Sequence, residues 1–125
     1  MRRHCHIRTL GFLVAVVTST ALAESDIVVD SRHHKLEFEN NCVRVVRATF
    51  GPGEKAAGMF DAKAAVIVSV TGSHGFKTTL GDGRVVESPA DLPGHVTWVP
   101  AGRIQPENTS DAQVEYIVVE PKGCR

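Results

Sequence analysis

The side chains most able to do chemistry in this chain are one acid and two histidines near its middle, Asp61, His74 and His95. Asp61 would act as a general base if a pocket raised its pKa, because an effective base titrates near the working pH. Together the three could hold a divalent metal, since Fe, Mn, Ni and Zn bind imidazole nitrogen and carboxylate oxygen. Their spacing matches no recognised metal motif, so this chemistry requires the fold to bring them together.

Other catalytic patterns are missing from the sequence. Ser73 and Ser110 lie in predicted turns without the Gly-x-Ser-x-Gly elbow of a serine nucleophile, and no Gly-rich phosphate loop precedes a helix. We expect His33 and His34, which precede the first long strand, to be solvated. These observations favour a protein without catalytic activity.

The N-terminal residues have the composition of a secretory signal peptide. Three Arg and no acid occur in residues 1–8, an apolar run follows at 9–17, and residues 21–23 (Ala-Leu-Ala) match a cleavage site. The apolar run is too short to cross a bilayer, which takes about 20 residues. We therefore predict a signal peptide at residues 1–23, one mature domain at 24–125 and a periplasmic or secreted location. An uncleaved anchor and a misassigned start are the alternatives.

The charge of the mature chain argues against two classes of partner. The full sequence has 14 basic and 14 acidic residues, and the loss of three N-terminal Arg leaves a net charge of −3. Nucleic acids and anionic membranes attract basic surfaces. We therefore expect neither a nucleic-acid partner nor stable membrane insertion of the mature chain.

Two of the three cysteines, Cys42 and Cys124, remain after the predicted cleavage. Cys42 opens the first strong strand and Cys124 follows the last, so they meet if those strands are antiparallel neighbours. An exported protein commonly oxidises such a pair. A disulfide closing a loop of about 80 residues would stabilise the fold by about 4 kcal/mol. The alternative is two separate thiols.

Short strands must position all of these residues, because no helical periodicity occurs after residue 23. Runs of β-branched residues alternate instead with turns that contain Gly, Pro and Asp. Closure or sheet-on-sheet packing removes the edges that such strands would otherwise expose. The sequence therefore predicts an antiparallel all-β sandwich or barrel, with a short extended segment near residue 60. The predicted strands are 27–29, 35–39, 43–50, 64–71, 75–80, 84–87, 96–99 and 114–120.

The spacing from Gly53 to Gly72 resembles the first motif of the cupin family, in which two glycines enclose His-x-His and a Glu. Laid on without a gap, the two His positions hold Met59 and Asp61, and the Glu position holds Ala65. The resemblance implies a jelly-roll β-barrel (a double-stranded β-helix) whose usual metal ligands are substituted.

A second stretch resembles the second cupin motif. Gly94, Pro100 and Gly102 occupy the family positions, and the third His falls on Ile104 or Gln105. Apolar side chains offer a metal no lone pair, and a thioether suits only soft ions such as Cu(I). The resemblance, with these departures from it, implies a barrel without a metal cofactor. A divalent metal held by non-standard ligands is the alternative.

Strand alternation then indicates which side chains face inward. If residues 59 and 61 point into the barrel, the period of two places Ala65, Ile67 and Ser69 inward and Val66, Val68 and Val70 outward. Outward valines on one strand favour a homodimer through that face. Trp98 and Tyr116 would line a pocket by stacking, or belong to the core. The candidate binding residues are Met59, Asp61, Ser69, Trp98, Ile104, Gln105 and Tyr116.

Two functions fit this interior. An open polar cavity beside Met59 and Asp61 would favour binding of a small molecule, whereas an apolar plug would favour a dimeric scaffold. We therefore expect an exported, non-enzymatic protein of one of these two kinds. The alternative is a metal-dependent enzyme, of dioxygenase or isomerase type, with Asp61, His74 and His95 as ligands.

Overall fold

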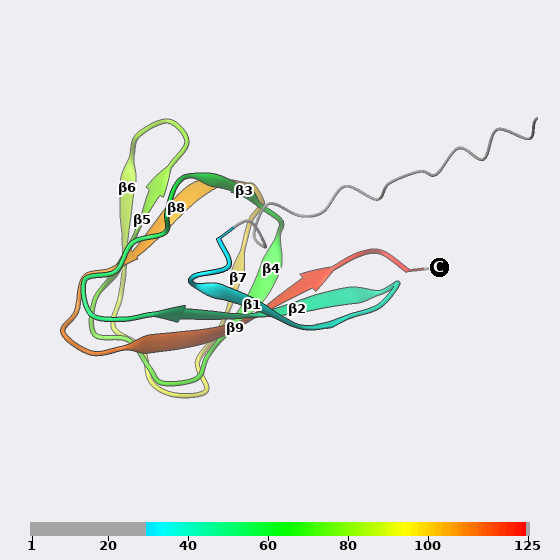
Figure 1. Ribbon diagram of the computed structural model, residues 1–125, viewed down its shortest axis with the longest axis horizontal. Helices are drawn as coiled ribbons and strands as arrows, with labels where there is room; N and C mark the ends of the chain where they lie inside the picture. The colour runs from blue at the N-terminus through cyan, green and yellow to red at the C-terminus, as the bar shows by residue number, and fades with distance from the viewer. Residues whose placement is uncertain (1–29, 125) are drawn as a thin grey trace, which may run out of the picture.

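In the part of the chain that the structure describes, short runs of β-branched and aromatic residues, separated by tight turns, form nine antiparallel strands (Figure 1). The computed structural model describes residues 30–124, so the predicted signal peptide and the strand expected at 27–29 lie outside that range. Within it there is no helix, and hence no helix long and apolar enough to span a bilayer. The strands are β1 (His34–Glu39), β2 (Val43–Phe50), β3 (Phe60–Ala62), β4 (Ala65–Ser69), β5 (Phe76–Leu80), β6 (Val85–Ser88), β7 (Val96–Val99), β8 (Gly102–Asn108) and β9 (Val114–Pro121).

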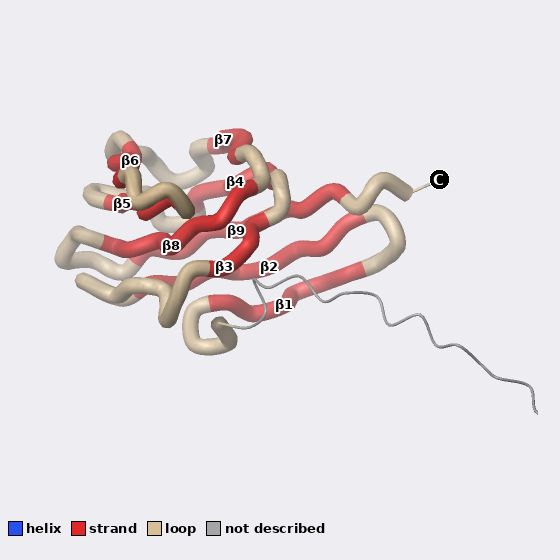
Figure 2. Tube along the Cα trace, turned by 90° about the horizontal axis from the view of Figure 1, so that it is seen from above, coloured by secondary structure: helices blue, strands red, loops and turns tan. Residues whose placement is uncertain are grey.

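The strands build two facing sheets, which overlap one another in the view of Figure 2. One sheet has the order β1-β2-β9-β4-β7 and the other the order β3-β8-β5-β6. From β3 onward the chain crosses between the two sheets at every step except the β5–β6 hairpin, so it winds around a common interior as a jelly roll does. The predicted all-β antiparallel fold is confirmed.

The inner face of the larger sheet carries the core. Every second residue of β2 is buried, including Val46, Ala48 and Phe50, because alternate side chains of a strand point to opposite faces. Val114 and Val118 of β9 lie beside them in register and are also buried. The predicted alternation of β4 is confirmed, since Ala65, Ile67 and Ser69 all face the interior.

Strand β8 is missing from the predicted set because Pro106 lies within it. The Ala56 amide donates to the Pro106 carbonyl at 2.9 Å, but proline has no N–H to return the bond to Ala56. The Gln105 side chain supplies the missing donor, with Nε2 2.9 Å from the Ala56 carbonyl oxygen. A side-chain amide thus lets a proline remain inside the sheet.

His33 and His34 are buried, at 3% and 6% exposure, so the expectation that they are solvated is wrong. His33 stacks on Phe50 at a ring-centroid distance of 4.5 Å, and its Nδ1 lies 2.9 Å from Asp30 Oδ2. Its Nε2 lies 3.3 Å from a Glu54 carboxylate oxygen without hydrogen-bond geometry. Burial alone would raise the pKa of Asp30, but hydrogen bonds from His33 and a backbone amide hold it below its usual value.

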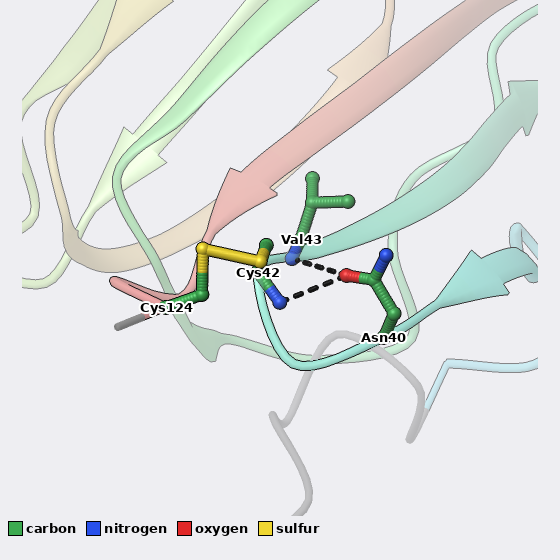
Figure 3. The surroundings of a disulfide bond; sticks show 4 residues. All are labelled: Asn40, Cys42, Val43 and Cys124. Atoms are coloured by element: carbon green, nitrogen blue, oxygen red, sulfur yellow. Dashed lines mark hydrogen bonds between the residues drawn. A yellow bond between two sulfur atoms is a disulfide. The ribbon is translucent and has the colours of Figure 1, made fainter.

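Cys42 and Cys124 form the predicted disulfide, with Cα atoms 4.3 Å apart (Figure 3). The bond follows from the antiparallel register of β2 and β9, which places Val43 opposite Pro121. The Asn40 side chain fixes the turn before β2 by accepting hydrogen bonds from the amides of Cys42 and Val43 at 2.8 and 3.0 Å. The disulfide therefore joins the end of the chain to the β1–β2 turn.

Candidate functional site

Strand register arranges the inner face of the larger sheet in rows. One row is polar and runs from Tyr116 on β9 to Ser69 on β4, whose amide donates to the His95 carbonyl at 2.9 Å. The neighbouring row is mostly apolar and includes Val118 and Ile67. A polar strip therefore borders an apolar row inside the barrel, and we call this row, which includes Val118 and Ile67, the apolar floor.

The space above this floor is a cavity of about 850 Å³. Protein interiors are otherwise close-packed, and binding pockets for small molecules commonly occupy about 300–1,000 Å³. The cavity reaches the last strand of each sheet, because Val86 of β6 and Thr97 of β7 both line it. Both edge strands are largely exposed, so solvent has access to the interior from that side. The interior is thus an open cavity, and its lining is mostly apolar rather than polar.

A cluster of four polar residues, Ser69, Ser73, Asp91 and Tyr116, lies at one end of the cavity. Ser69 Oγ donates to Asp91 Oδ1 at 2.9 Å, and the backbones of Ser73 and Asp91 exchange two hydrogen bonds of 3.1 and 2.9 Å. Burial raises the pKa of Tyr116, the Asp91 charge adds to this, and the nearby Ser73 hydroxyl opposes it. The contact between the two hydroxyls lacks standard hydrogen-bond geometry. Tyr116 therefore keeps its proton at neutral pH.

Gly72 allows the segment that carries Asp91 to approach the barrel. Its φ is +76°, which side chains rarely tolerate, and its amide donates to Ser69 Oγ at 3.1 Å. A Cβ at this position would lie 2.9 Å from the Asp91 carbonyl oxygen. Gly72, which the motif spacing singled out, thus lets the backbone of Asp91 come close enough for its carboxylate to reach the cavity.

Aromatic rings form a wall next to the polar cluster. Phe50, Phe76 and Tyr116 line the cavity, with Phe76 packed edge-on against Phe50 at 5.8 Å and against Tyr116 at 5.3 Å. His34 also lines it and meets Phe50 and Phe60 edge-on. Burial lowers the pKa of His34, so its neutral form is favoured.

The structure brings together only some of the predicted binding residues. Ser69, Ile104 and Tyr116 line the cavity. Gln105 instead bonds the Ala56 backbone, and Trp98 lies in an exposed position on β7. Met59 is also absent from the lining.

The inward orientation expected for Asp61 is wrong. Phe60 and Ala62 line the cavity, while the Asp61 side chain is 63% exposed and lies 3.8 Å from an Arg103 nitrogen. The two residues between Ala62 and Ala65 shift the alternation by one position, so inward β4 residues do not imply an inward Asp61. Burying Phe60 and exposing the Asp61 carboxylate also costs less free energy than the reverse, because an unpaired charge is costly to bury.

The donor set does not fit the metal that the cupin resemblance implies. Phe60, Ala62, Ala65 and Ile104 face the cavity around the family positions and offer no ligand atom. His95 lines the cavity, but Asp61 and His74 do not. Within residues 30–124 no group of three or more His, Cys, Asp or Glu is arranged to hold a metal ion. Asp61, His74 and His95 therefore do not converge.

Sequence reasoning missed Asp91, which it assigned only to a turn. The turn is present at Pro93-Gly94, but Asp91 itself forms a β-bridge with Ser73, and its carboxylate reaches Ser69 across 22 positions of chain. One signal was present in the sequence. The turn at Pro93-Gly94 leads into β7, which pairs antiparallel with β4, so an acid just before that turn lies near the end of β4. Phe76 was likewise visible only as a strand residue.

Comparison with known proteins identifies the fold. No protein-family model matches the sequence, and no curated protein matches it. Among solved structures it resembles a cupin domain from Bordetella pertussis Tohama I, with 23% identity, a TM-score of 0.63, and coverage of 72% of this chain and 92% of that one. It also resembles an RmlC-like cupin family protein with a double-stranded β-helix fold from Methanocaldococcus jannaschii, with 14% identity, a TM-score of 0.53, and coverage of 70% and 77%.

A third similar structure is the polyketide cyclase RemF from Streptomyces resistomycificus, with 19% identity, a TM-score of 0.51, and coverage of 71% of this chain and 63% of that one. Similarities at these identities establish the fold. The chain has the cupin fold, a double-stranded β-helix, as the motif spacing predicts.

Proposed function

We propose that this protein is an exported, non-enzymatic binder that holds one small, largely apolar molecule inside its barrel. The observation that carries this proposal is the open cavity of about 850 Å³ between the two sheets. Its mostly apolar lining with a few polar groups at one end is the usual composition of a small-molecule pocket. An interior filled by apolar side chains, which would have favoured the scaffold function, would leave no such space.

The chemistry of the lining supports binding over catalysis. The cavity-facing residues near the cupin metal positions carry no ligand atoms, and Asp61 points away from the interior. Ser69 bonds Asp91 directly, without a histidine between them to take its proton. A metal-dependent enzyme remains the competing function, and one tightly held metal per purified chain would overturn our proposal.

Binding of the neutral, apolar dye Nile red tests the proposal. The variant Ile67→Trp places an indole on the apolar floor and should abolish the fluorescence gain that the wild-type protein produces. Thr79→Trp is the matched control, because Thr79 lies on the opposite face of β5 from the cavity-lining Thr78 and Leu80. Equal fluorescence from both variants would contradict binding inside the barrel.

A second function, assembly into a homodimer, is supported by the outer face of the larger sheet. Val66 and Val68 of β4 point away from the cavity, opposite Trp98 and Val96 of β7, which are each 58% exposed. Ile117 and Val119 of β9 flank the other side of β4. Large exposed apolar patches are uncommon on monomers and mark interaction sites.

Sedimentation velocity tests the dimer. Trp98→Lys should shift the protein to monomer, because a charge buried without a partner opposes association. Val85→Lys on β6 changes an apolar residue of similar fractional exposure on the other sheet and should leave the dimer intact. A wild-type protein that stays monomeric at high concentration would remove this function.

Export to the periplasm or the medium is the third part of the proposal. The N-terminal sequence pattern and the disulfide both support it, since disulfides persist in oxidising compartments. N-terminal sequencing of the exported protein should begin at Glu24. An intact N-terminus on protein confined to the cytoplasm would contradict export.

A further inference from the structure

We propose that the bound molecule carries an ammonium group, which lies at the polar end of the cavity against Asp91. This inference rests on the proposed function, since it names the chemical class of the ligand. The apolar floor accepts the body of the molecule and the polar end accepts its head.

The first argument is the charge at that end. Asp91 lines the cavity, and its carboxylate receives a hydrogen bond from Ser69 Oγ. Among residues 30–124, no Lys or Arg forms an ion pair with it. A carboxylate facing an apolar cavity is stabilised by a cation, and a bound ammonium group would supply one.

The other carboxylates of the lining differ in this respect. Glu120 lies at the opposite end of the inner face, where Arg44 is directly across from it in register. Asp82 lies on the exposed β5–β6 turn, and its Oδ2 is 2.7 Å from Arg84 Nε. Asp91 is therefore the lining carboxylate that has no Lys or Arg partner among the described residues. A cationic ligand would supply that partner.

The second argument is the aromatic wall. Phe76 and Tyr116 line the cavity, and the charge of Asp91 is close enough to Tyr116 to act on its hydroxyl. The faces of aromatic rings attract cations, and a carboxylate beside such rings is a favourable environment for an ammonium ion. A ligand carboxylate placed here would instead meet a like charge, which disfavours binding.

Three ligands with the same body and different heads test the inference: octylamine, octanol and octanoate. Each is titrated at pH 7 by displacement of Nile red. We expect octylamine to bind about ten times more tightly than octanol, from the difference between charge-assisted and neutral hydrogen bonds. Octanoate should bind most weakly.

Asp91→Asn should remove the preference for octylamine and leave octanol binding unchanged, because the amide keeps an oxygen that accepts from Ser69. Asp61→Asn, which removes a carboxylate that points away from the cavity, should leave both affinities unchanged. Thermal unfolding of each variant confirms that it is folded.

Equal binding of octylamine and octanol by the wild-type protein overturns the ammonium inference alone, as does an equal loss of both in Asp91→Asn. Failure of all three ligands and of Nile red to bind overturns the proposed function itself.

Discussion

Removal of the disulfide should cost a large share of the stability of this domain. The two cysteines are separated by 82 positions, so the bond closes most of the described chain into one loop. On the chain-entropy account, a loop of that length lowers the entropy of the unfolded state enough to stabilise the folded state by about 4.5 kcal/mol. Domains of this size have a total stability of about 5–15 kcal/mol. The double variant Cys42→Ser/Cys124→Ser should therefore be only marginally folded.

Urea unfolding followed by circular dichroism measures the difference. The oxidised wild-type protein should exceed the double variant by about 4.5 kcal/mol in unfolding free energy. Wild-type protein reduced with dithiothreitol should match the variant, which separates loss of the bond from the effect of the serines. A difference below about 1 kcal/mol would refute the reasoning, because it would mean that the loop does not constrain the unfolded chain.

Two further predictions concern buried polar residues. Asn108 is fully buried, and its amide nitrogen lies 2.7–3.1 Å from three backbone carbonyl oxygens. Asn108→Ala should therefore lower the unfolding free energy measured in urea by about 3 kcal/mol. A loss below about 1 kcal/mol would contradict this role. Burial holds the pKa of His34 below its ordinary 6.5, so as pH falls below 6.5 the unfolded chain takes up protons first and the unfolding free energy declines. His34→Gln should flatten the pH dependence of stability just below pH 6.5, and an unchanged slope would assign it to other groups.

Local patterns in the sequence predicted most of the strands because their causes are local. Strand β2 follows from a run of β-branched residues ended by Gly51 and Pro52, and Pro100 ends β7 at the predicted position. The alternation of β4 was predictable for the same reason. Strand β8 was not, because Pro106 normally excludes a central strand and its rescue by Gln105 depends on a residue 49 positions away.

The site was less predictable because its geometry is set by contacts across the chain. Asp91 becomes a cavity residue only through its bonds to Ser69 and Ser73. The burial of His33 depends on stacking against Phe50. The orientation of Asp61 depends on the two residues that separate β3 from β4, a detail that motif spacing cannot resolve.

The most direct test of binding inside the barrel is a nuclear magnetic resonance titration of the methyl groups with octanol. Our account predicts that the signals of Ile67, Val118 and Ile104, which line the cavity, shift and saturate at one ligand per chain. The outward-facing methyls of Val66 should stay in place. Shifts confined to the outer face, or no saturable shift at any cavity methyl, would contradict it.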